Sequence, residues 1–189
     1  MSSPIDPAAL LIEWRSGSRA SFDELFRLVY DDLRERARRY LRHQPAGHTL
    51  TATALVHEAY LKLIGLERVP SEDRAQFLAL SARAMRHVLI DYARSSRTAK
   101  RGGKEGRPAL ELDEDLVLTD TGADQLLDLH DALDRLAGVS ERLSRIVELR
   151  YFGGMTIEET AQALAVAPST VKLDWQKAKA WLYRDLAEP

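Results

Sequence analysis

One stretch near the C-terminal end, MTIEETAQALAVAPSTVK, constrains the fold more than any other part of the sequence. Thr156 followed by Glu159 has the spacing of a capping box, which predicts the start of a short helix. Pro168, at the end of AVAP, suits the first position of a second helix, where its missing N–H costs nothing. The second helix would bury a stripe at helical spacing: Val171, Trp175, Ala178 and Leu182. The stretch therefore predicts a helix-turn-helix.

The outer face of that second helix is polar and basic. In a helix-turn-helix this helix enters the major groove, with its first residues at the base edges. Hydroxyl and backbone N–H groups bind phosphate, lysines neutralise it, and a glutamine amide can read a base. The candidate DNA-binding residues are Ser169, Thr170, Lys172, Gln176, Lys177 and Lys179. An acid on this face would repel DNA phosphates. Asp174 therefore either lies at the rim of the DNA-facing surface and contacts a cytosine amino group, or turns toward the protein. A plain helical hairpin is the alternative.

The remaining chain is also helix-patterned. Ser21 and Glu24 have capping-box spacing and predict a helix that ends at Gln44-Pro45-Ala46-Gly47. A second amphipathic helix is expected from Leu55 to near Gly65, and a third from Phe77 to Arg94. No segment alternates convincingly as a strand does. The sequence thus predicts an all-α fold.

A segment rich in Gly, Ser and basic residues, SSRTAKRGGKEGRP, follows the third helix and reads as a flexible linker. Helical patterning resumes near Leu126. We therefore expect two helical domains, residues 1–95 and 126–189, joined by a linker at 96–125.

The net charge of −2 hides an uneven distribution. The chain is basic from Arg83 to Arg107 and acidic from Glu111 to Asp134. A basic nucleic-acid face beside an acidic segment that shields it would produce this pattern. Two solvated surfaces of opposite sign would produce it equally well.

Several functional classes are disfavoured by what the sequence lacks. It has no cysteine for disulfides or thiol catalysis, and no apolar run of membrane-spanning length. The N-terminus does not resemble a signal peptide, so a cytoplasmic protein is expected. The five histidines are scattered without metal-ligand spacing, and no glycine-rich phosphate loop is present. We expect neither an enzyme nor a cofactor or metal.

These stretches together resemble a known family. LSRIVELRYFGGMTIEETAQALAVAPSTVK is similar to the promoter-distal domain of bacterial sigma-70-type factors, and most similar to the extracytoplasmic-function (ECF) group. In the N-terminal half, FDELFRLVYDDLRERARRYL, ALVHEAYLKL and FLALSARAMRHVLIDYARSSR resemble the first helix, the polymerase-docking helix and the minus-ten helix. The resemblance covers about residues 10 to 187. It implies that core RNA polymerase and promoter DNA are the partners. Whether an anti-sigma factor also binds the chain stays open.

The resemblance also implies roles for particular residues. The polymerase-binding positions are Leu55, Val56, His57, Glu58 and Leu61. The positions facing the melted minus-ten strand are Arg83, Arg86, His87 and Arg94, which we expect to form one basic strip. The candidate DNA-binding residues of the last helix fall at the minus-thirty-five element.

Two other protein classes stay open. A stand-alone helix-turn-helix regulator would bind duplex DNA without polymerase, which a gel shift with and without core enzyme would reveal. A helical protein-interaction adaptor is a third class, but that function does not explain the basic stretch from Arg83 to Arg107.

The docking helix departs from the family at its start. Relatives typically read Asp-Ala-Glu-Asp before LVQE, whereas this chain reads Thr51-Ala52-Thr53-Ala54 before LVHE. A phosphothreonine carries about −1.5 to −2 charges and is favoured at a helix N-terminus. The resemblance extends to ECF factors thought to be activated by a Ser/Thr protein kinase. We therefore expect phosphorylation at Thr51, with Thr53 second. The alternative is that one of them is only an N-cap.

Overall fold

The computed structural model describes residues 6–41, 49–66, 73–99 and 123–187, and these residues form helices and no strand. The predicted all-α fold is confirmed. The first half contains α1 (Pro7–Arg15), α2 (Arg19–Leu41), α3 (Ala52–Ile64) and α4 (Arg74–Ala99). The second half contains α5 (Ala123–Val139), α6 (Glu141–Val147), the π-helical turn η1 (Glu148–Phe152), α7 (Ile157–Leu164) and α8 (Pro168–Ala187).

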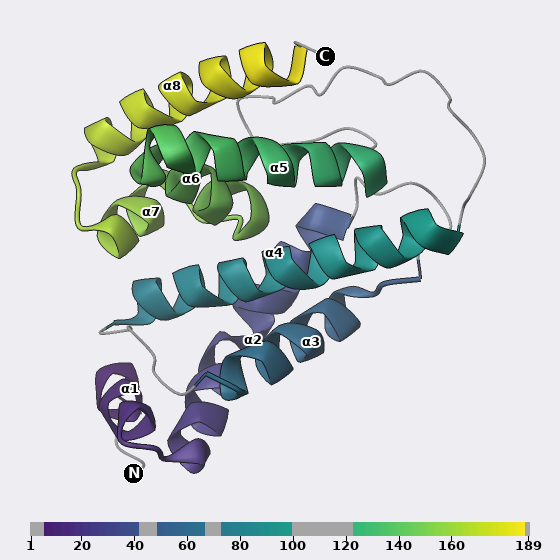
Figure 1. Cartoon of the computed structure of the whole chain (residues 1–189). Coiled ribbons are helices and arrows are strands. Elements are labelled where there is room, and N and C mark those ends of the chain that lie inside the picture. Colours follow the sequence, from purple (N-terminus) through teal and green to yellow (C-terminus); the bar gives the residue numbers. More distant parts are fainter. Residues whose placement is uncertain (1–5, 42–48, 67–72, 100–122, 188–189) are drawn as a thin grey trace.

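Helix α4 lies at the centre of a layered arrangement (Figure 1). One side of α4 packs against α2 and α3, and α1 packs on α2. Its other side packs against α5, η1 and α7, and α8 covers α5, α6 and α7 from outside. Accordingly, α4 is apolar on both of these sides and polar only along narrow strips.

The start of α2 differs from the sequence prediction. The helix begins at Arg19, and the Ser18 hydroxyl accepts a hydrogen bond from the Ser21 backbone N–H at 3.3 Å. Ser21 therefore lies inside the helix, where its buried hydroxyl donates to Glu13 of α1. The prediction that Ser21 caps the helix was wrong, because a serine one turn earlier supplies the cap.

Helix α4 is longer than predicted at both ends. At its start, the Asp73 carboxylate accepts a hydrogen bond from the Gln76 N–H at 2.8 Å. At its end, the helix continues through residues 96–99, which were assigned to the linker. Helix α5 begins at Ala123, three residues before the predicted start. Residues 100–122 lie outside the described residues, and they hold most of the predicted linker and the first half of the acidic run. The predicted Gln44–Gly47 break also lies outside the described residues.

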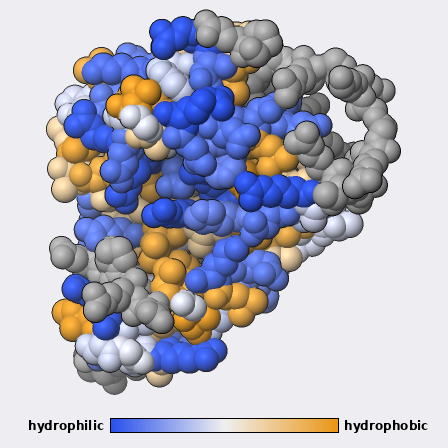
Figure 2. Space-filling model, viewed as in Figure 1, coloured by the Kyte–Doolittle hydropathy of each residue, from blue (hydrophilic) through white to orange (hydrophobic). Residues whose placement is uncertain are grey.

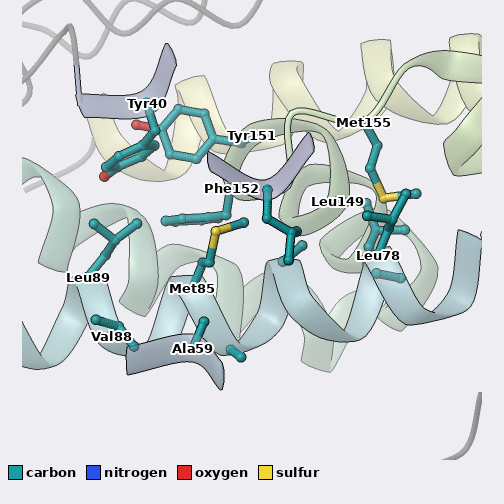
Figure 3. Close-up of a cluster of buried hydrophobic side chains, with 14 of the residues drawn as sticks. Tyr40, Ala59, Leu78, Met85, Val88, Leu89, Leu149, Tyr151, Phe152 and Met155 are labelled. Atoms are coloured by element: carbon teal, nitrogen blue, oxygen red, sulfur yellow. The ribbon is translucent and has the colours of Figure 1, made fainter. Parts of the chain in front are cut away.

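The two halves share one continuous hydrophobic core. We call their contact the seam: it joins α2 and α4 of the first half to α5, η1 and α7 of the second. Figure 3 shows Met85 and Leu89 of α4 pointing toward Phe152 of η1. The rings of Phe152 and Tyr40 stack across the seam with centroids 6.0 Å apart. The division of the sequence into two domains stays a prediction, since the halves are in close contact.

Gly153 permits this close approach. A Cβ built at this position would lie 2.5 Å from the Leu149 carbonyl oxygen and 2.6 Å from the Ala82 Cβ of α4. Any larger residue would push η1 away from α4. Gly153 is therefore required both by the backbone of η1, through Leu149, and by the packing of η1 against Ala82 of α4.

Candidate nucleic-acid and polymerase interface

The C-terminal helices form as the sequence predicts. The Thr156 hydroxyl accepts from the Glu159 N–H at 3.1 Å, and the Glu159 carboxylate accepts from the Thr156 N–H at 2.9 Å. These two bonds complete the capping box at the start of α7. The turn that follows contains Ala165 in the left-handed region, with φ of 53°. The predicted inner stripe of α8 is buried: Val171, Trp175, Ala178 and Leu182.

The outer face of α8 carries the predicted DNA-binding residues. Ser169, Lys172, Gln176 and Lys177 are exposed, and Thr170 and Lys179 are half-buried. The Lys179 ammonium group lies 5.6 Å from the Trp175 ring centroid. This face offers hydroxyl, amide and ammonium groups on one rigid helix, which is the chemistry needed for phosphate and base contacts.

Asp174 turns toward the protein, which is one of the two alternatives for this residue. It is only 2% exposed, and its Oδ2 accepts a hydrogen bond from Arg142 Nε at 2.7 Å. The Lys177 ammonium group approaches Oδ1 at 3.5 Å. The acid on α8 is therefore neutralised by two cations from within the molecule.

Helix α4 exposes part of the expected basic strip. Arg83, His87 and Arg94 are exposed on this helix. Partial desolvation lowers the pKa of His87, and the charges of Arg83 and Arg86 lower it further. His87 is therefore neutral at pH 7 and can stack on an unpaired base or hydrogen-bond to it.

Arg86 does not belong to this exposed strip. It is 7% exposed and reaches across the seam, where Nη1 donates to Glu148 Oε1 at 3.0 Å. Its Nη2 donates to Asp134 Oδ1 at 3.1 Å and lies 2.6 Å from His130 Nδ1. Its guanidinium carbon lies 5.7 Å from the Phe152 ring centroid. The expectation of four residues on one strip was wrong for Arg86, because its side of α4 packs against the second half.

The histidine beside Arg86 is placed to accept a hydrogen bond from it rather than to add a second charge. Burial lowers the pKa of His130, and the positive charge of Arg86 lowers it further, while Asp134 acts in the opposite direction. At pH 7 the ring is neutral, and its Nδ1 can accept a hydrogen bond from Arg86. The two terminal amino groups of the guanidinium thus contact two carboxylates and one neutral imidazole, whereas its buried Nε makes no hydrogen bond within the described residues.

A second buried arginine in the seam was not anticipated. Arg36 of α2 donates to the Gly153 carbonyl oxygen at 2.8 Å and to Glu159 Oε1 at 2.8 Å. Burial alone would raise the pKa of Glu159, but the Thr156 N–H and Arg36 outweigh this effect and lower it. Arg36 shares a helix face with Leu33 and with Tyr40, and this spacing was the available signal.

The predicted polymerase-docking helix has a buried and an exposed side. Leu55 and Val56 are 1% and 0% exposed, so the structure places them in the core rather than on a docking surface. His57, Glu58 and Leu61 are exposed, and Leu61 is 57% exposed. Figure 2 shows hydrophilic side chains over much of the visible face, with apolar patches over the second half and also below α4, over α2 and α3.

The first turn of α3 contains the two threonines. Thr51 is the exposed N-cap, and its hydroxyl accepts from the Ala54 N–H at 3.1 Å. Thr53 is half-buried. No acidic residue is present in this first turn. The N-cap role is therefore realised at Thr51, which remains accessible to modification.

Within residues 6–41, 49–66, 73–99 and 123–187, no three His, Asp or Glu side chains are grouped so as to hold a metal ion. In the same ranges, no helix is long and apolar enough to cross a membrane.

Comparison with known proteins identifies one family. The sequence model described as "ECF sigma factor" matches residues 6–188, which is nearly the whole chain. No curated protein matches the sequence.

Proposed function

Because the chain belongs to the ECF sigma factor family, we propose that this sigma factor is switched on by phosphorylation of Thr51 at the start of α3. Sigma factors of this family bind core RNA polymerase and promoter DNA to direct transcription initiation, and they are not enzymes.

Each surface has a proposed partner. The outer face of α8 contacts the minus-thirty-five element through six residues: Ser169, Thr170, Lys172, Gln176, Lys177 and Lys179. On α4, Arg83, His87 and Arg94 contact the melted minus-ten strand. On α3, His57, Glu58 and Leu61 contact the polymerase. Leu55 and Val56 support that surface from the core.

The observation that carries the switch is the exposed Thr51 cap on a helix whose first turn has no acid. A phosphate there would lie beside the free N–H groups and the positive end of the helix dipole. It would restore negative charge where relatives carry carboxylates. Thr53 is the second choice, since its half-buried side chain is less accessible to a Ser/Thr kinase.

The size of the effect follows from interface electrostatics. Each exposed ion pair between sigma factor and polymerase contributes roughly 0.2–1 kcal/mol. The absence of three family acids would weaken docking by one to several kcal/mol, about tenfold to a thousandfold in Kd. A dianionic phosphate offsets a large part of this loss.

The test is binding to core polymerase and in vitro transcription by unmodified protein and by protein carrying phosphothreonine at position 51. We expect at least about tenfold tighter binding and higher transcription with the phosphate. Thr51→Asn is the matched control, because asparagine caps a helix as well as threonine but cannot be phosphorylated.

Equal, strong binding by the unmodified protein, Thr51→Asn and the phosphorylated form would rule out the switch. Protein phosphorylated only at Thr53 distinguishes the two positions. A gel shift without polymerase tests the surfaces separately, because tight binding of the free chain to duplex DNA would favour a stand-alone regulator.

A further inference from the structure

We infer that Asp174 is a positioning residue, which holds Arg142 of α6 beside α8 as an additional DNA-phosphate contact. This inference rests on the proposed role of α8 at the minus-thirty-five element. Arg142 is the second residue of α6, and its side chain is 55% exposed. Asp174 binds its Nε, so both terminal amino groups of the guanidinium remain available to a ligand on the solvent side.

The position of Asp174 on α8 determines where Arg142 lies. Successive residues of a helix are rotated by about 100°, so Thr170, Asp174 and Lys177 share one flank of α8. Leu173 and Gln176 lie further round, on the outermost side. When a helix lies in the major groove, its flanks face the phosphate walls of that groove. Arg142 is therefore held against a wall, next to Lys177.

The burial of Asp174 argues against a direct role at the DNA. A carboxylate that is 2% exposed cannot reach a base edge without breaking its bond to Arg142. Its charge makes an unambiguous test possible. If Asp174 acted only by repelling DNA, Asp174→Asn would bind more tightly. If it positions Arg142, the same change weakens binding despite the gain in net charge.

The experiment measures binding of the holoenzyme to a duplex that the wild-type holoenzyme selects from a random-sequence pool, over a range of KCl concentrations. We expect Arg142→Gln to lower affinity roughly tenfold, the value of one charge-assisted hydrogen bond. It should also reduce the slope of log K against log[KCl] by about one. Arg142→Lys should keep the slope and recover part of the affinity. Arg145→Gln, an exposed arginine on the same helix, is the matched control.

Wild-type slopes and affinities in both Arg142→Gln and Asp174→Asn would overturn the inference. Tighter binding by Asp174→Asn would also overturn it. Failure of the proposed α8 interface is a separate outcome, because Gln176→Ala and Lys177→Ala would then also bind like the wild type. Arg142 is exposed, so its substitution tests the inference even if Asp174→Asn fails to fold.

Discussion

Among the ion pairs that join an arginine to an acid on another helix, Arg86–Glu148 buries both partners, whereas Arg142–Asp174 buries only the acid. In the seam, the Arg86 side chain is 9% exposed, and its partner Glu148 is 10% exposed. At α8, the side chain of the acid Asp174 is 3% exposed, whereas the side chain of Arg142 is 55% exposed. The seam removes a cation from the surface, and the α8 pair displays one.

The difference shows that an ion pair can either hinder or favour nucleic-acid binding, depending on which partner is buried. A basic residue on a DNA-facing helix contributes nothing while carboxylates of the other half surround it. An acidic residue on a recognition helix can favour DNA binding when it is buried and orients a basic neighbour. The free energy of unfolding of variants at each pair can break or sharpen this contrast.

Arg86→Gln should have the largest effect. Removing the cation leaves Glu148 buried in the seam without a charge partner, and breaking a buried pair in this way costs about 3–5 kcal/mol. Urea unfolding should show a correspondingly lower midpoint. Arg83→Gln, three residues earlier on the same helix but exposed, should change stability by no more than about 0.5 kcal/mol. Equal losses in the two variants would contradict the buried pair.

Asp174→Asn should be destabilising by a smaller amount, about 1.5–3 kcal/mol, because it weakens one charged hydrogen bond but leaves no charge buried alone. The same urea titration measures it. Arg142→Gln should cost less, since the exposed arginine is partly replaced by solvent and Lys177 still faces the acid. A larger loss for Arg142→Gln than for Arg86→Gln would reverse the contrast between the two pairs.

Gly153→Ala tests the seam through packing rather than charge. The added methyl group meets the Leu149 carbonyl and Ala82, neither of which can move easily, so we expect a loss of about 1–3 kcal/mol. Gly138→Ala on α5 is the control, because a Cβ there meets nothing within 4 Å. It should be neutral or stabilising by up to about 1 kcal/mol. A neutral Gly153→Ala would mean that the halves are not in close contact.

Features determined by neighbouring residues could be predicted from the sequence. The capping box, the turn and the apolar stripe of α8 each depend on residues within a few turns of one another, and all were found. The Ser21 cap failed for a local reason too, since Ser18 offered an equivalent hydroxyl one turn earlier. The start of α4 was placed three residues too late, because the Asp73 cap lies ahead of the first apolar residue of the periodic pattern.

Contacts between distant residues could not be predicted in this way. Arg86 is 62 residues from Glu148, and Arg36 is 123 residues from Glu159. Nothing in the spacing of arginines along α4 distinguishes one that faces solvent from one that faces a second half. The same holds for Leu55 and Val56, which the docking motif includes although they are buried. The motif identifies the helix, and packing determines which of its residues are exposed.

The smallest expected effect is a pH dependence of the seam. The pKa of His130 is lowered by burial and by Arg86, so the folded protein disfavours its protonation relative to the unfolded chain. Above the unfolded-state pKa of His130, near 6.5, the ring is neutral in both states and its contribution to stability is fully present. As the pH falls from there toward the lower pKa of the folded state, protons bind preferentially to the unfolded chain and this contribution is lost. His130→Gln retains an acceptor for Arg86 but cannot titrate. Urea unfolding at pH 8 and pH 5.5 should therefore show the wild type losing stability relative to His130→Gln at the lower pH. A constant difference between the two proteins would show that the ring does not titrate against Arg86, so that only Glu148 and Asp134 stabilise this cation electrostatically.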